Sequence, residues 1–288
     1  MVETGLRLQL DPQQDLHVIS DSHFARLDEN DFGAPGLVAI ESVGPFVELG
    51  QVGPFVTIHD SFMEPGLGIG HHPHRYHERL FYILSGEVGH DDALNHITGQ
   101  MSEGDLAQLT EGERGMLHKE WNQAPGVRTH IFILVYRPDV DPPPPTASFA
   151  ALRAADRPIY KEGDGAETTE LVGSRSAFRP NLNRLHFFGD TSLDSGGSVA
   201  IEMRPNEGTI LYALKGQIAL EQLSQSIELL GTGDSWPEGP NAIALVWSND
   251  APRTLQLRST NGAARFIRVT FARGEDELLL HQPYQRRV

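Results

Sequence analysis

The chain has 288 residues, a formal net charge of −16 and no cysteine. The excess of acid disfavours nucleic-acid binding, because a phosphate backbone requires clustered Lys and Arg and the one basic cluster is Arg286-Arg287. The lack of cysteine excludes disulfides, thiolate metal sites and thiol nucleophiles, so any metal ion must be bound by His, Asp or Glu.

The length is sufficient for two domains, and the sequence contains the same pattern twice. Residues 81–88 match residues 211–218, and Gly-Asp and Glu-Gly pairs follow in the same order, always about 130 residues apart. Four consecutive prolines between the copies indicate a semi-rigid linker. We expect an N-terminal domain over 1–140, a linker over 141–148 and a C-terminal domain over 149–288.

The ends and apolar runs of the chain predict no membrane contact. Met1–Arg7 lacks the basic start and long apolar run of an export signal. The longest apolar runs, such as Ile131–Tyr136, are far too short to cross a bilayer. We therefore expect a soluble, cytoplasmic protein.

The first informative element in chain order is a His-rich stretch of extended chain. Because side chains two residues apart in a strand share a face, His72 and His74 point the same way, and Glu78 joins them if the strand stays regular. His71 falls on the other face, where we expect it in solvent. His77 is also off the shared face and is expected at a pocket rim.

The segments that follow predict an all-β fold. Leu80–Leu84 and Thr129–Tyr136 are rich in aromatic and β-branched residues, which indicates strands buried on both faces. Strands separated by Gly turns and repeated in two copies predict two tandem antiparallel β-barrels or sandwiches. Few helices are expected. Two short, peripheral ones are predicted, at Ala147–Ala155 and Asp276–Leu280.

A second cluster of candidate ligands follows roughly forty residues after the first. His118 and Glu120 share one face of a predicted strand. One H-x-H pair is weak evidence for a metal in a chain with 13 His, but two such clusters in strand context are much stronger. His90 and His96, which flank two aspartates, are expected in turns.

These residues resemble two known motifs. The pattern of Gly66, His72, His74 and Glu78, followed by Gly104-Asp105 and Gly115-x-x-His118, is similar to the two motifs of the cupin superfamily of small β-barrels. More narrowly, the chain resembles the pirin family of iron-binding proteins with two cupin domains, a likeness that is specific over about 45–136. It is carried by His72-Pro73-His74-Arg75, Gly86-Glu87-Val88-x-His90-Asp91-Asp92 and Gly115-Met116-Leu117-His118-Lys119-Glu120.

The resemblance implies one iron ion held by His72, His74, His118 and Glu120. Glu78 competes with Glu120 for the carboxylate position, since other cupins often use it. The pirin pattern favours Glu120, which shares a strand with His118, and leaves Glu78 to orient an imidazole. Three imidazoles and a carboxylate suit Fe(II), with Mn, Co, Ni, Cu or Zn competing, and a purely structural Zn is the alternative.

The second copy lacks these donors. The repeat offset places the ligand positions on residues that form no metal-binding set, so we expect a C-terminal cupin domain without metal ligands. These residues are Glu202, Arg204, Gly208, Trp247 and Asn249.

Some pirin-family proteins are quercetin 2,3-dioxygenases, so the resemblance implies a metal-dependent oxidoreductase that opens a flavonol-type ring with O₂. Glu120 is the expected proton acceptor, and Glu78 or His77 is the alternative candidate. An apolar pocket should hold the planar substrate. Its candidate lining residues are Phe62, Met63, Leu80, Tyr82 and Trp121.

Two other functions remain open at this stage. Pirins also act as iron-dependent transcriptional co-regulators, which implies a redox sensor that binds a protein partner and no direct contact with nucleic acid. The third candidate is a cupin sugar isomerase or small-molecule binder that uses Zn or Mn. Dioxygen uptake, partner capture and anaerobic isomerisation distinguish the three.

Overall fold

The computed structural model describes residues 8–11, 14–222, 225–233, 239–274 and 278–284. The basic pair Arg286-Arg287 and the start of the chain, Met1–Arg7, lie outside these residues. Within the described part the chain is almost entirely β, with one α-helix and two short 3₁₀ helices. None of the described helices is long and apolar enough to cross a membrane.

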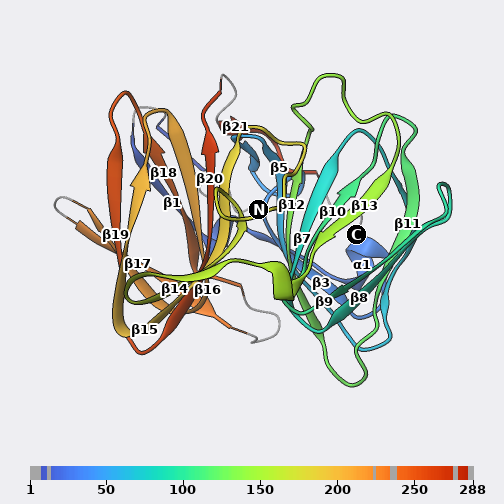
Figure 1. Cartoon of the computed structure of the whole chain (residues 1–288), viewed down its shortest axis with the longest axis horizontal. Helices are drawn as coiled ribbons and strands as arrows, with labels where there is room; N and C mark the ends of the chain where they lie inside the picture. Colours follow the sequence, from blue (N-terminus) through green and yellow to red (C-terminus); the bar gives the residue numbers. More distant parts are fainter. Residues whose placement is uncertain (1–7, 12–13, 223–224, 234–238, 275–277, 285–288) are drawn as a thin grey trace, which may run out of the picture.

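Two antiparallel β-structures lie side by side (Figure 1). The first contains the four-residue helix α1 (Glu29–Phe32) and most strands of the first half of the chain. Its strands are β2 (Ala25–Leu27), β3 (Leu37–Val43), β4 (Leu49–Val52), β5 (Phe55–Met63), β6 (Gly68–His74), β7 (Glu78–Ser85), β8 (Glu87–Asp92), β9 (Ile97–Ser102), β10 (Leu106–Thr110), β11 (Met116–Asn122), β12 (Thr129–Tyr136), β13 (Ser148–Leu152) and β21 (Leu278–Leu280).

The second β-structure is one eight-stranded sheet that curls on itself, because β20 pairs with both β15 and β16. Two 3₁₀ helices, η1 (Asp21–His23) and η2 (Ala154–Asp156), lie outside the sheets. The strands of the second β-structure are β1 (Leu16–Ser20), β14 (Ile159–Val172), β15 (Leu185–Met203), β16 (Glu207–Gln222), β17 (Gln225–Thr232), β18 (Ala242–Ser248), β19 (Arg253–Ser259) and β20 (Ala264–Ala272).

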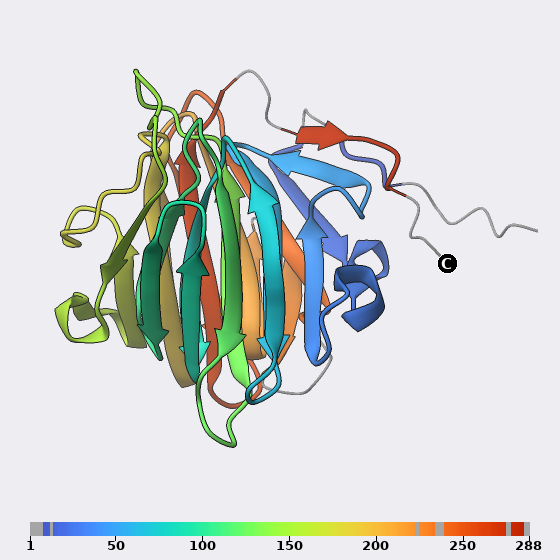
Figure 2. The ribbon, with the colours of Figure 1, turned by 90° about the vertical axis from the view of Figure 1, so that its right-hand side faces the viewer.

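The first β-structure has two sheets. Nine strands form the larger sheet, in the order β13-β10-β7-β12-β5-β3-β2 with β4 and β21 beside this path. The smaller sheet has the order β6-β11-β8-β9. Strands at the two ends of the chain cross between the halves: β1 pairs with β18 of the second structure, and β21 pairs with β4 of the first (Figure 2).

An apolar core joins the two halves. Tyr82 and Phe132 of the first half pack against Phe188 and Tyr212 of the second, with a Phe132–Tyr212 ring distance of 5.0 Å. A second core fills the interior of the C-terminal structure with aliphatic side chains. Burial of this kind stabilises a fold by about 1.5–3 kcal/mol for each large side chain, so the two halves are held together firmly.

The predicted strands at residues 80–84 and 129–136 are confirmed and are almost entirely buried on both faces. The predicted helix at Ala147–Ala155 is wrong. Residues 148–152 form β13, which pairs with β10 along its full length, so the sheet edge satisfies backbone groups that a helix would pair internally. The predicted helix at Asp276–Leu280 is also not observed: Leu278–Leu280 is a strand, and Asp276 lies outside the described residues.

Candidate metal centre

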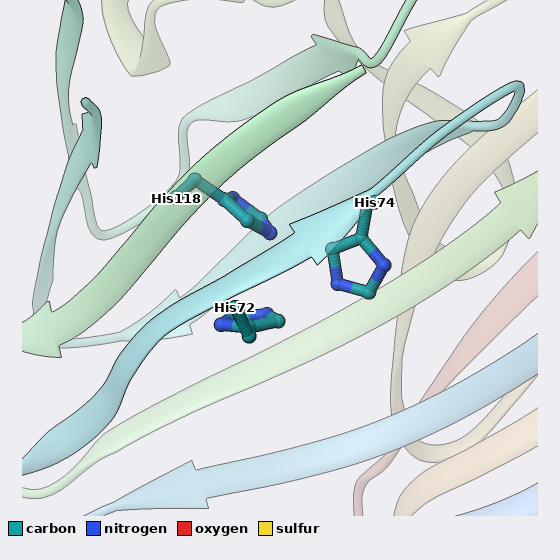
Figure 3. A group of neighbouring side chains, drawn as sticks. All are labelled: His72, His74 and His118. Carbon is teal, nitrogen blue, oxygen red and sulfur yellow. The ribbon is translucent and has the colours of Figure 1, made fainter. Parts of the chain in front are cut away.

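Strands β6 and β11 bring three histidines together. In their antiparallel register His72 lies directly opposite His118, and His74 follows on the same face of β6. The ring centroids are 4.7 Å apart for His72–His74, 4.4 Å for His72–His118 and 4.9 Å for His74–His118. The three rings point toward one another, and each offers a nitrogen within 4.8 Å of the others (Figure 3).

Hydrogen bonds leave one ring nitrogen available on His72 and on His118. His72 Nδ1 donates to the carbonyl of Gly70 at 2.8 Å, so in the neutral ring Nε2 carries a lone pair. The Nε2 atom of His118 is fully buried and has no hydrogen-bond partner among the described residues. A buried nitrogen without a partner is costly, and a metal ion would remove that cost. The residues present therefore fit a bound metal ion.

Glu120 lies beside these histidines and is buried. Its Oε1 accepts from His118 Nδ1 at 2.9 Å, while Oε2 lies 3.9 Å from His72 Nε2. Burial alone would raise the pKa of Glu120, but the His118 ring, by charge and by hydrogen bond, outweighs it and lowers the pKa to about 2. Glu120 is therefore an anion beside a cluster of imidazoles, as a site for a divalent cation requires.

His74 has a cationic neighbour. Arg79 Nη2 donates to His74 Nδ1 at 2.9 Å, and the same guanidinium pairs with the buried carboxylate of Glu111. Burial, reinforced by the charge of Arg79, lowers the pKa of His74 well below its usual value, and burial likewise lowers the pKa of His72. Both rings are thus kept neutral. Because Arg79 donates to Nδ1 of His74, the proton of that ring lies on Nε2, so His74 binds a metal only where Nδ1 exchanges this hydrogen bond for the ion.

Glu78 is not brought together with the histidines. Its carboxylate is fully buried on the opposite side of the larger sheet and accepts hydrogen bonds from Thr110 at 2.7 Å, Tyr136 at 2.9 Å and Asn181 at 2.6 Å, among others. Because Asn181 follows β14 in the second half of the chain, Glu78 helps to join the two halves. His77 also lies apart from the cluster, with Nδ1 3.8 Å from Glu111.

His90 is a neighbour of the cluster that the sequence did not indicate. The expectation that it lies in a turn is wrong: it is buried in β8, opposite Glu120 of β11, with its ring 5.2 Å from His118. It forms a second possible ligand group with His118 and Glu120. His96 does lie in a turn, whereas His71 is exposed and contacts Asp91 at 3.3 Å.

A cavity of about 270 Å³ adjoins the cluster and is lined by His72, His74, His118 and Glu120. Of the five expected lining residues only Met63 lines it. Side chains alternate along β7, so Leu80 and Tyr82 face the core between the two halves while Phe81 faces the cavity. The other walls are mainly apolar, with Ile131, Ile133 and Val135 contributed by β12.

The second half shows no comparable group among its described residues. Glu202 accepts from Thr254 on the exposed sheet surface, Trp247 is buried against Phe271, and Asn249 donates to Asp15. Much of the interior of this half is occupied by buried, mainly aliphatic side chains.

Comparisons with known proteins identify relatives of this chain. Residues 29–134 match the Pirin family model. Human Pirin is 29% identical over 206 residues, covering 65% of this chain and 67% of that protein. A quercetin 2,3-dioxygenase of Escherichia coli K12 is 33% identical over 83 residues, covering 29% of this chain and 35% of that protein.

Solved structures share the whole architecture. The bacterial pirin YhhW from Escherichia coli, determined in complex with nickel(II), superposes with a TM-score of 0.64 at 15% identity and covers 90% of this chain and 100% of that one. At this identity the likeness concerns the fold. Together the two findings show a Pirin-family domain at residues 29–134, within a chain that has the fold of a bacterial pirin.

Proposed function

We propose that this chain is a mononuclear non-heme iron protein that opens a flavonol-type ring with O₂. His72, His74 and His118 would hold Fe(II) together with Glu120 through Oε2, which faces His72. Mn, Co, Ni, Cu and Zn would compete for the same donors. The observation that carries the proposal is the convergence of three imidazoles and one carboxylate on the wall of a mainly apolar cavity.

A bound Fe(II) would supply Lewis acidity toward the neighbouring hydroxyl and carbonyl oxygens of a flavonol and electron transfer toward O₂. The chain provides the surroundings for that chemistry. The cavity has apolar walls formed in part by Phe81, Ile131 and Ile133. A planar ring would pack against these walls and exclude water from them. Glu120 would be the acceptor for the hydroxyl proton, because its carboxylate lies beside the histidine cluster and lines the cavity.

The location of the cluster favours an enzyme over a regulator. His118 and Glu120 are buried, and the cluster lines a cavity, so a small molecule can reach the donors more readily than a partner protein can. A co-regulator would be supported instead by metal-dependent capture of a protein partner without consumption of O₂.

The test is O₂ consumption with quercetin by protein purified without oxygen and loaded with Fe(II). The proposal predicts stoichiometric loss of quercetin and O₂, abolished in His118→Ala and preserved in His96→Ala, which alters a turn histidine outside the cluster. Iron binding without any O₂ uptake would exclude the dioxygenase function.

A further inference from the structure

The wall of the cavity opposite the metal-ligand cluster contains a histidine–carboxylate pair. Glu41 of β3 lies directly across from His59 of β5, and His59 Nε2 is 2.7 Å from Glu41 Oε2. Both residues line the same cavity as His72 and His118. The chemistry proposed for the metal site makes no use of this pair.

Glu41 is held firmly in place. It is 1% exposed, and its other oxygen, Oε1, accepts a hydrogen bond from the backbone N–H of Phe46 at 2.6 Å. The loop passes so close that a Cβ atom on Gly44 would collide with the Glu41 carboxylate. The loop and the carboxylate are therefore arranged before any ligand binds.

The fixed carboxylate determines which nitrogen of the His59 ring carries the proton. A carboxylate only accepts, so Nε2 of His59 must be the donor, and Nδ1 of the neutral ring keeps its lone pair. Nδ1 has no hydrogen-bond partner among the described residues, and the ring faces the cavity. His59 thus presents a hydrogen-bond acceptor to whatever occupies the cavity.

Strand register places this acceptor away from the metal-ligand cluster. His59 lies opposite Ile133 of β12, which lies opposite Phe81 of β7. Two strand spacings, together roughly 10 Å, therefore separate His59 from Phe81. The next residue of β7 that faces the cavity is Arg79, which hydrogen-bonds His74. The cavity therefore has polar groups at two places and apolar walls between them.

We propose that His59, oriented by Glu41, accepts a hydrogen bond from a hydroxyl group of the substrate at the end remote from the metal-ligand cluster. The cavity would then select polyhydroxylated aromatic compounds: one end chelates, the rings pack on Ile133 and Phe81, and a distal phenol donates to His59 Nδ1. This inference rests on the proposed function, because the cluster must hold the chelating end.

Two flavonols distinguish binding at the metal-ligand cluster from binding at His59. Quercetin and 3-hydroxyflavone share the chelating hydroxyl–carbonyl pair, but 3-hydroxyflavone lacks every other hydroxyl. Their dissociation constants are measured by ligand absorbance at pH 8, without oxygen, on Ni(II)-loaded protein. One hydrogen bond corresponds to roughly tenfold, so the wild type should prefer quercetin by about that factor.

The variants His59→Phe and Glu41→Gln should each reduce this preference to near unity. His59→Phe removes the acceptor, and Glu41→Gln lets the amide donate to Nε2, which turns Nδ1 into a donor. Neither should change metal content or the affinity for 3-hydroxyflavone. The matched control is His186→Phe, which breaks a histidine–glutamate pair of the second half, with Glu207 2.6 Å away, and should leave the preference intact.

The outcomes are distinguishable. A preference for quercetin that survives in both folded variants would overturn the role of His59 and leave the metal site standing. Failure of the wild type to bind 3-hydroxyflavone when loaded with metal would overturn the proposed function, and this inference with it. If His59→Phe does not fold, Glu41→Gln still decides, because Gln preserves the shape of the side chain.

Discussion

His72 and His118 face each other across β6 and β11, with ring centroids 4.4 Å apart. They come from motifs roughly forty residues apart in the chain, and the antiparallel register is what makes them neighbours. Three imidazoles gathered in this way would repel one another if protonated, yet burial keeps His72 and His74 neutral. The arrangement is suited to a cation and has no evident role in stabilising the barrel.

Removal of His118 should abolish metal binding without unfolding the protein. His118→Ala deletes a buried imidazole from β11, while the surrounding core of the N-terminal half is formed by other, apolar residues. We expect metal affinity to fall by more than about 100-fold, beyond the loss typical of a group that only orients a ligand. Elemental analysis and far-UV circular dichroism of the same sample measure both effects, and a normal metal content would exclude His118 as a ligand.

Glu120→Gln tests whether the carboxylate binds the metal or only orients His118. A ligand role predicts that metal affinity and activity fall together, by roughly 10- to 100-fold or more. Isothermal titration with Ni(II) gives the affinity directly. Retained affinity with loss of activity would instead assign Glu120 to orientation of the His118 ring and to proton transfer.

Glu78→Gln should reduce stability and spare metal binding. The carboxylate is fully buried and accepts from Thr110, Tyr136 and Asn181, so an amide in its place would set an N–H₂ group against these donors. We expect a loss of about 2–3 kcal/mol in the free energy of unfolding. Urea unfolding measures this loss, and a drop in metal content of the folded variant would contradict the assignment.

The junction between the halves should make the protein sensitive to alkali. Burial, with support from Asp60, raises the pKa of Tyr212 well above its usual value, and burial together with Glu78 does the same for Tyr136. Above pH 10 the unfolded chain releases these protons and the folded chain retains them, so stability is full below pH 10 and falls as pH rises.

Each tyrosine with a raised pKa should steepen the fall in the free energy of unfolding above pH 10 by about 1.4 kcal/mol per pH unit. Tyr212→Phe should therefore be less stable than the wild type at pH 8, because Asp60 loses its hydrogen bond from Tyr212. Its stability should decline less steeply between pH 10 and 11. Equal slopes for the two proteins in urea unfolding would show that Tyr212 is not retained as a neutral phenol.

The sequence predicted which of these side chains share a face, because this depends on local alternation along a strand. His72 with His74, and His118 with Glu120, each share a face as expected. Glu78 was misplaced by the assumption that the strand stays regular to that residue. The chain bends at Tyr76, which has a φ of 73°, and β7 then enters the other sheet, so Glu78 faces the junction between the halves.

The neighbours missed by the sequence reasoning depend on pairing between distant strands. His90 lies opposite Glu120 because β8 pairs with β11, and His59 lies opposite Glu41 because β5 pairs with β3. Neither β8 nor the segment around His59 carries an apolar pattern that marks such a partner. The helix expected at 147–155 failed for the same reason, since the open edge of β10 determines the conformation of β13.

Whether these histidines hold a metal ion is tested by the metal content of protein purified without oxygen, compared between the wild type and the variant His72→Ala/His118→Ala. We expect about one transition-metal ion, chiefly iron, in each wild-type chain and almost none in the folded variant. Equal metal content in the two proteins, or a wild type that stays metal-free after incubation with Fe(II), would contradict this expectation.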